Sequence, residues 1–363
     1  MAKIFFSLSG EGRGHATRVR ALVELLRGEH QLTLFTSLVA YDLLASAYQA
    51  TPHVRVRRIP GLQFAYRQGR LDYFRSVWNA VPYLGGLPRL VDTLAKMIHD
   101  ECPDLAIVDF EPALPRAARR CGLPYVSFDH QHFLVVSDLS ALPWSLRWRA
   151  WLIGLSVGLF CRGQQGTIVS SFFRPPRKRR WAAARQIGAL LRPEVLRAEP
   201  VEGDHLLVYL RRFAEANVMQ ALRACGRRVR LYGQGTQPAD GNIEYRAVEE
   251  EGFLADLASC YALISNAGNQ LVGEALFLRK PMLALPEPGN FEQAVNAHFL
   301  RAGGGDSAES RTLTPDRLQQ FLQRVPRLRN EIRPEEANGN EEALLALQRF
   351  LQTSRAAPPA AAA

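Results

Sequence analysis

Short apolar segments alternate with helical patterns along the first half of this chain. The segments expected to form strands span residues 3–9, 31–36, 53–59, 104–109 and 124–128. Helical patterns lie between them, near residues 16–28, 87–101 and 111–121. Strands that alternate with helices form a parallel sheet with helices on both faces. The order of elements therefore predicts an α/β fold.

A second series of the same kind follows an irregular stretch. Its apolar segments are Leu206–Leu210, Val229–Tyr232, Ala262–Ser265 and Pro281–Leu285. A length of 363 residues suits two domains of about 150 to 180 residues each. The expected divisions are an N-terminal domain over 1–175, a C-terminal domain over 176–340, a helix over 341–354 that packs back on the N-terminal domain, and a disordered tail over 355–363.

Cysteine usage and the N-terminus indicate a cytoplasmic protein. The five cysteines are scattered and form no C-x-x-C pair, which argues against a disulfide framework and a zinc ribbon. The first predicted strand begins almost at Met1, without a signal-peptide pattern. The longest apolar run, Trp151 to Cys161, falls well short of the roughly 20 residues that a helical membrane span needs.

A glycine loop follows the first predicted strand and opens the first helix. It reads Gly10-Glu-Gly12-Arg-Gly14-His15, and its backbone N–H groups favour a negative or polar ligand. It does not match the G-x-G-x-x-G dinucleotide pattern, so a nicotinamide enzyme is disfavoured. The glycines alone are also explained by a tight turn. His15 at this edge of a parallel sheet is a candidate general base.

Asp109 ends a predicted strand, so it lies on the same carboxyl edge of the sheet as the glycine loop. A carboxylate there could orient the imidazole of His15. The spacing does not establish that the two side chains meet. The alternative is that Asp109 caps the helix that follows.

Two polar loops end strands in the second half. Asn266-Ala267-Gly268-Asn269 leads into a helix whose N-terminus suits a phosphate, and Glu274 follows within two turns. Glu274 could reach a ribose beside the phosphates, or it could merely complement the helix dipole. One strand later, a second turn delivers an acid and an amide to the same edge. Its candidate residues are Asn290, Glu292 and Gln293.

Taken in order, these motifs resemble those of GT-B glycosyltransferases. The group includes the lipid-II-forming N-acetylglucosaminyltransferase and the plant and macrolide nucleotide-sugar enzymes, and the resemblance covers nearly all of residues 1–353. It implies two Rossmann-like domains that face each other across a cleft. The first would bind the acceptor and the second a UDP-sugar. Such enzymes need no bound metal, so none is expected here.

The resemblance also implies a role for each motif. His15 would activate the acceptor hydroxyl, and Asp109 would pair with it. Glu274 would bind the ribose diol, and the acid and amide pair, Glu292 and Gln293, would bind hexose hydroxyls. The expected donor-binding residues are Gly12, Gly14, Asn266, Ala267, Gly268, Asn269, Glu274, Asn290, Glu292 and Gln293.

The chain departs from the family pattern in two places. Arg211-Arg212 stands where the closest relatives have a glycine- and serine-rich loop near the diphosphate, so charge could be supplied there instead. Asp129, His130 and His132 occupy the region of acceptor-side residues in relatives. An H-x-H with a nearby aspartate could alternatively bind a metal.

A tryptophan and arginine pattern at helical spacing lies between the two halves. Its residues are Trp144, Arg147, Trp148, Arg149 and Trp151. One aromatic face with a basic rim suits an anionic membrane interface, although tryptophans at this spacing are also typical of a core. The basic cluster at 177–180 favours the membrane.

The leading interpretation is an inverting glycosyltransferase that moves a hexose from a UDP-sugar to a hydroxyl of a membrane-associated lipid or cell-envelope acceptor, on the inner face of the cell membrane. A UDP-sugar 2-epimerase on the same fold is the alternative enzyme. The net charge of +10 also suggests a third interpretation, a basic nucleic-acid-binding protein. No nucleic-acid partner is expected, because the arginines and aromatics form no recognition motif and the loop carboxylates would repel a phosphate backbone.

Overall fold

The computed structural model describes the chain except for residues 64, 68–69, 161, 212–213 and 357–363, and it contains two compact units. The first unit comprises Met1–Tyr66, Asp72–Arg192 and the C-terminal segment that begins at Gly339. The second comprises Pro193–Asn338, together with a short segment near Arg67. The predicted disordered tail lies largely outside the described residues.

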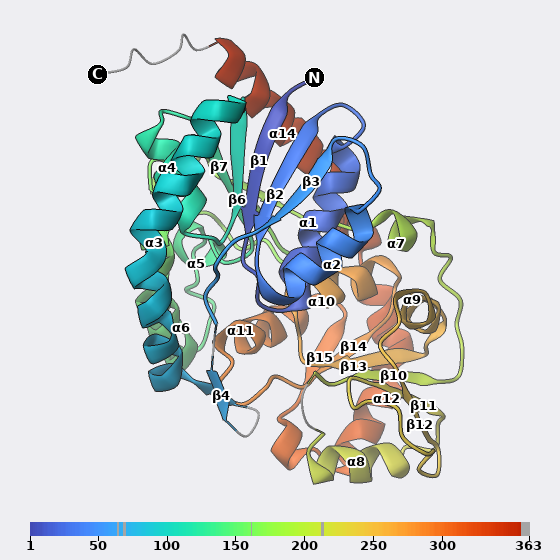
Figure 1. Ribbon diagram of the computed structural model, residues 1–363. Helices are drawn as coiled ribbons and strands as arrows, with labels where there is room; N and C mark the ends of the chain where they lie inside the picture. Colours follow the sequence, from blue (N-terminus) through green and yellow to red (C-terminus); the bar gives the residue numbers. More distant parts are fainter. Residues whose placement is uncertain (64, 68–69, 161, 212–213, 357–363) are drawn as a thin grey trace. The chain divides into compact units, whose positions relative to one another are not determined.

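The first unit is built on a seven-stranded parallel sheet (Figure 1). Its strands are β1 (Lys3–Leu8), β2 (Gln31–Thr36), β3 (Val54–Arg58), β6 (Leu105–Asp109), β7 (Tyr125–Asp129), β8 (Gly166–Ser170) and β9 (Arg185–Ile187). They pair in the order β3-β2-β1-β6-β7-β8-β9. The five strands predicted in the first half are confirmed, each with ends within about one residue of the expected position.

Helices cover both faces of this sheet, because successive strand residues point to opposite sides. Ile4, Phe6 and Leu8 pack in a core with α1 (Arg13–Leu26), α2 (Leu38–Tyr48) and α14 (Asn340–Ala356). Phe5 packs on the other face with α3 (Tyr73–Glu101) and α4 (Ala113–Arg120). Figure 1 shows these two layers on either side of the sheet.

Two helices of the first unit differ from the sequence prediction. The helix α3 begins at Tyr73 rather than near residue 87, and it continues through Pro82 and Pro88. Proline removes a backbone donor and normally ends a helix, so these two prolines argue against a longer helix at the level of sequence. The helix α2 was not predicted, since it has neither a side-chain cap nor charged residues at its ends.

The last helix belongs to the first unit. Ala343, Leu347 and Leu351 of α14 are buried in the same core as α1. Before this helix, Gly339 N donates to the carbonyl of Ala189 at 2.9 Å. The division between the units falls after Arg192, later than the sequence predicts, because β8 and β9 complete the first sheet before the chain leaves it.

The second unit contains a six-stranded parallel sheet with the order β12-β11-β10-β13-β14-β15. Its strands are β10 (Leu206–Tyr209), β11 (Val229–Tyr232), β12 (Ile243–Arg246), β13 (Ala262–Ser265), β14 (Met282–Ala284) and β15 (Gly305–Ser307). Its longer helices are α8 (Ala216–Arg223), α9 (Glu250–Ser259), α10 (Asn269–Phe277), α11 (Phe291–Leu300) and α12 (Pro315–Glu331). Residues of α8 and α12 pack on one face of the sheet in a continuous core.

The remaining elements are short, apart from α6 (Trp144–Phe160) in the first unit. They are β4 (Ala65–Arg67), β5 (Arg70–Asp72), α5 (Phe133–Val136), α7 (Pro193–Arg197), α13 (Pro334–Ala337) and the 3₁₀ helices Arg179–Trp181 and Ser310–Thr312. Within the described residues, no helix combines the length and apolar character needed to cross a membrane.

Replacing Leu347 tests whether α14 stabilises the first unit. The side chain is fully buried, so Leu347→Ala should lower the free energy of unfolding by about 2 to 5 kcal/mol. Leu345 lies on the same helix with half its surface exposed, and Leu345→Ala should change stability by less than about 0.5 kcal/mol. Urea unfolding measures both variants. Equal effects would contradict the packing described here.

Candidate active site

The carboxyl edge of the first sheet brings the glycine loop next to the end of β6. Leu8 of β1 is paired with Asp109 of β6, and Ser9 N donates to the Asp109 carbonyl at 3.0 Å. Gly12 precedes α1 with a φ of 82°, a conformation that glycine adopts without strain. Gly14 lies in the first turn of the helix, where no other atom approaches its Cα closely enough to exclude a side chain.

His15 and Asp109 meet at this edge. His15 Nδ1 lies 2.9 Å from Asp109 Oδ1. The carboxylate is fully buried, whereas the imidazole keeps 15% of its surface exposed. If Nδ1 carries its proton toward the carboxylate, Nε2 holds a lone pair. That tautomer is the one in which a histidine accepts a proton from a substrate hydroxyl.

Arg18 completes this cluster, and sequence reasoning missed it. Its Nε lies 3.1 Å from Asp109 Oδ2, and its Nη2 lies 2.6 Å from Oδ1 and 2.8 Å from Oδ2. The same Nη2 is 2.9 Å from His15 Nδ1. Arg18 is only 4% exposed. Its position three residues after His15 places both on one helix face, which was the available signal.

A second histidine and aspartate pair follows β7. His132 Nδ1 lies 2.6 Å from Asp129 Oδ2, and the backbone N–H of His132 donates to Oδ1 at 2.8 Å. Ser127 Oγ donates to the same carboxylate at 2.9 Å. Burial opposes the charged form, but His132 outweighs it and holds the pKa of Asp129 below its usual value. The buried His132 Nε2 has no hydrogen-bond partner among the described residues.

His130 has a different environment from its neighbours in the sequence. Its ring lies 4.9 Å from that of Phe133 and 5.7 Å from that of Phe173, measured between centroids. Across the part of the chain that the structure describes, no three side chains of the histidine, cysteine, aspartate and glutamate types are grouped to hold a metal.

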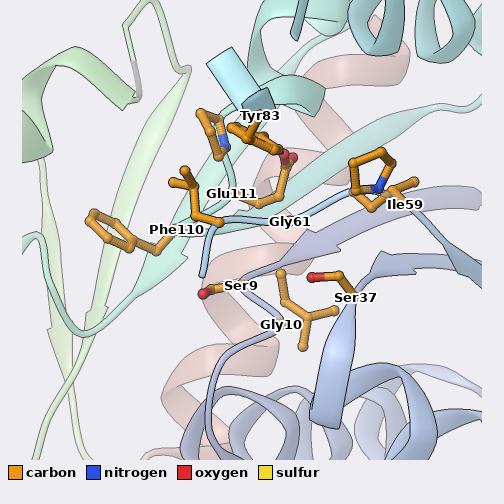
Figure 2. Close-up of a pocket in the computed structure, with 12 residues that line it drawn as sticks. Ser9, Gly10, Ser37, Ile59, Gly61, Tyr83, Phe110 and Glu111 are labelled. Atoms are coloured by element: carbon orange, nitrogen blue, oxygen red, sulfur yellow. The ribbon is translucent and has the colours of Figure 1, made fainter. Parts of the chain in front are cut away.

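A pocket opens at the same sheet edge (Figure 2). Its walls come from the loops after β1, β2, β3 and β6 and from Tyr83 of α3. They are mainly apolar, with Ile59, Leu62 and Phe110 among them. A side chain at Gly10 would collide with the loop after β2, so glycine permits this close approach.

Glu111 forms the buried polar part of the pocket wall, and sequence reasoning did not identify it. Its carboxyl accepts from Tyr83 Oη at 3.1 Å and from the backbone N–H groups of Ala113 and Leu114 at 2.7 and 2.9 Å. Burial raises the pKa of Glu111, while these backbone hydrogen bonds oppose the rise. The residue ties α3 to the start of α4.

In the second unit, the loop after β13 is held on three sides. Asn266 Oδ1 accepts from Arg211 N at 3.0 Å, and its Nδ2 donates to the Leu285 carbonyl at 2.9 Å. Asn296 of α11 donates to the carbonyl of Ala267 at 2.9 Å. Ala267 has a φ of 58°, an uncommon conformation for a residue with a side chain. Arg212 lies outside the described residues.

The loop leads directly into α10. Gly268 precedes the helix, and no side chain caps its N-terminus. Asn269 begins the helix. Glu274 is buried on α10, where its Oε1 accepts from Gln270 Nε2 at 3.3 Å. The loop and the start of the helix therefore present backbone N–H groups close to a buried carboxylate.

The loop after β14 is ordered by its own side chains. Asn290 Oδ1 caps α11 by accepting from Gln293 N at 3.2 Å. Gln293 Oε1 accepts from Glu287 N at 2.7 Å, so this oxygen has a structural role. Glu292 is half-buried in the first turn of the helix.

The tryptophan pattern lies on α6, and its aromatic side chains are exposed. Trp144, Trp148 and Trp151 are 71%, 48% and 65% exposed. Leu152 and Leu155 extend the same exposed stripe. The opposite side of the helix is buried at Ala150 and Val157, and α6 packs on α5. Arg147 lies over the Trp144 ring, 5.5 Å from its centroid, and Arg149 is half-buried. The tryptophans are therefore not core residues.

The sequence profile of glycosyl transferase family 1 matches residues 2–326, so the chain belongs to that family. It is a glycosyltransferase, and the predicted enzyme class is confirmed. Comparison with curated protein sequences gives no match.

Solved structures with a similar fold include three glycosyltransferases. The glycotransferase of kitacinnamycin is 18% identical with a TM-score of 0.65, over 96% of this chain and 98% of that chain. MurG of Acinetobacter baumannii is 13% identical with a TM-score of 0.61, over 96% and 100%. UGT89C1 of Arabidopsis thaliana, complexed with UDP-L-rhamnose, is 15% identical with a TM-score of 0.67, over 96% and 99%. These similarities confirm the GT-B fold.

Asp129→Asn tests the charge of the second pair. Folding lowers the pKa of Asp129, so its carboxylate stabilises the folded protein at any pH above the pKa of an unfolded aspartate, near 3.9. This contribution is lost as the pH falls through the lower pKa of the folded state. At pH 7 and at pH 5, the free energy of unfolding of the variant should be about 1.5 to 3 kcal/mol below that of wild type. This difference in stability should become smaller below about pH 4.

Urea unfolding at pH 7, 5 and 3.5 measures the difference in stability between wild type and Asp129→Asn. Asp92→Asn is the matched control, because Asp92 is 61% exposed and pairs with an exposed arginine. Its effect should stay within about 1 kcal/mol. A gap for Asp129→Asn that widens on acidification would contradict the assignment.

Proposed function

We propose that this enzyme transfers a hexose from a UDP-sugar to a hydroxyl of a membrane-associated lipid or cell-envelope acceptor, with inversion at the anomeric carbon. The observation that carries the proposal is the 2.9 Å contact between His15 Nδ1 and Asp109 Oδ1, at the open edge of a parallel sheet. A partly exposed imidazole held by a buried carboxylate suits a general base.

In the proposed reaction, His15 Nε2 takes the proton of the acceptor hydroxyl. The acceptor oxygen forms a bond to the anomeric carbon while the bond from that carbon to the diphosphate oxygen breaks. UDP leaves with the electron pair. Asp109 orients the imidazole through Nδ1 and stabilises its protonated form. A single displacement of this kind inverts the anomeric configuration.

The donor would bind to the second unit. We assign the diphosphate to the loop Asn266–Gly268 and the start of α10, whose N–H groups and dipole stabilise the developing charge of UDP. Glu274 would hold the ribose diol, and Asn290, Glu292 and Gln293 would contact the hexose. In this assignment the backbone N–H groups stabilise the negative charge of the diphosphate, so the reaction uses no bound metal.

One structure with the same fold, UGT89C1, is complexed with UDP-L-rhamnose, which supports the nucleotide-sugar donor proposed here.

The exposed stripe on α6 supports a membrane-associated acceptor. Three tryptophans and two leucines face solvent along one side of the helix, with Arg147 exposed beside them. Aromatic side chains partition into the headgroup region, and arginines are attracted to anionic lipids. We therefore propose that the enzyme acts at the inner face of the cell membrane, with an anionic lipid surface on this stripe.

The function is tested by a panel of UDP- and TDP-sugars assayed for nucleotide release. Wild-type enzyme should release UDP only when bacterial membrane lipid extract is present, together with a glycosylated product. Free sugar released without lipid extract would identify an epimerase and contradict the proposal.

The base is tested by His15→Ala. Turnover should fall by roughly 10² to 10⁴, because proton transfer acts in the transition state. UDP affinity measured by calorimetry should change little, since the imidazole acts on the acceptor proton, whereas the residues proposed to hold the nucleotide, Asn266–Gly268 and Glu274, belong to the second unit. Turnover near the wild-type value would remove His15 from the chemistry and direct attention to His132.

The membrane surface is tested by cosedimentation with phosphatidylglycerol vesicles at low salt. Wild-type protein should bind them, bind neutral vesicles poorly and be released as salt screens the attraction. Trp148→Ala with Arg149→Glu should weaken binding at least fivefold while leaving the melting temperature within a few degrees. Leu345→Ala with Arg349→Glu, at exposed positions of α14, is the matched control and should bind like wild type. Wild-type protein that ignores anionic vesicles would contradict the surface.

A further inference from the structure

Arg18 has no assigned role, yet it contacts both members of the proposed catalytic pair. We propose that Arg18 is a positioning residue that fixes the Asp109 carboxylate against His15 and so holds the imidazole in the tautomer and orientation of a general base. The inference rests on the function proposed above, because it gives Arg18 a part in the same proton transfer.

The first argument is geometric. Two nitrogens of the planar Arg18 guanidinium donate hydrogen bonds to both oxygens of Asp109, at 2.6 to 3.1 Å. Both residues are buried, so neither side chain can exchange its partner for water without a large cost. The fork geometry fixes the plane of the carboxylate as well as its position. This leaves Oδ1 directed at His15 Nδ1, 2.9 Å away.

The second argument concerns the proton on His15 Nδ1. Asp109 Oδ1 can only accept a hydrogen bond, whereas Arg18 Nη2 can only donate one, and both lie 2.9 Å from Nδ1. Nδ1 can satisfy only one of them at a time. Because Arg18 already has two oxygens to donate to, it does not need the imidazole. The tautomer with a proton on Nδ1 is therefore favoured, and Nε2 remains the acceptor.

During transfer, the acceptor hydroxyl gives its proton to Nε2 as its oxygen bonds to the anomeric carbon and UDP departs. Arg18 would keep Oδ1 of Asp109 directed at His15 Nδ1 throughout this step, so that the imidazole stays aligned with the acceptor hydroxyl.

Three variants test the inference with a donor and acceptor that wild-type enzyme turns over. Arg18→Met removes the charge and the fork, and Arg18→Lys keeps the charge but loses the fork. Arg27→Met, at an exposed end of the same helix, is the matched control. The readouts are kcat and the KM for the donor.

Arg18→Met should lower kcat about 10- to 100-fold with the donor KM unchanged. Arg18→Lys keeps the charge and should lower kcat less than Arg18→Met does. Arg27→Met should match wild type. Arg18→Met that folds with wild-type kcat would overturn the inference.

A double substitution separates positioning from general stability. If Arg18 acts through His15, His15→Ala with Arg18→Lys should be no slower than His15→Ala alone. If the double variant instead loses turnover by the product of the two single losses, the inference is overturned, whereas the proposed function is not affected. Full activity in His15→Ala would instead overturn the proposed function. If Arg18→Met does not fold, Arg18→Lys and the double variant decide the matter on the same criteria.

Discussion

The buried carboxylate of Asp109 is the constraint around which the first unit is organised. A negative charge with no exposed surface must be paired and hydrogen-bonded, since desolvation is otherwise too costly. Arg18 and His15 supply the partners from one face of α1, one turn apart. The same contacts fix the helix against the end of β6. The placement of α1 therefore depends on one cluster, and His15 is its partly exposed member.

Amide side chains order the carboxyl edge of the second sheet. The loop after β13 is held by Asn266 and Asn296, whose amide groups bind the backbone of Arg211, Leu285 and the loop itself. This leaves the uncapped start of α10 to present N–H groups. A rigid set of neutral donors suits a diphosphate leaving group, because its charge increases during the reaction. Each unit thus presents a different chemistry at the carboxyl edge of a parallel sheet.

The sequence predicts the parts of this architecture that depend on local periodicity. Strand positions follow from short apolar runs, and the placement of Asp109 at the same edge as His15 follows from parallel pairing. Arg18 was missed because this chain has many exposed arginines, and only its spacing of three residues from His15 on the predicted helix distinguishes it from them. Pro82 and Pro88 concealed the first half of α3, since tertiary packing overrode their helix-breaking tendency. Whether Trp148 is core or surface depends on which side of α6 meets α5, which composition alone does not determine.

The account holds that His15 activates an acceptor hydroxyl for a single displacement on a UDP-sugar. The anomeric configuration of the first-formed product tests this most directly, and proton NMR of the product made from an α-linked UDP-hexose measures it. A β-linked product is the predicted result, because attack from the face opposite UDP inverts the carbon. An α-linked product would contradict the account, since it requires either a covalent intermediate or attack from the same face.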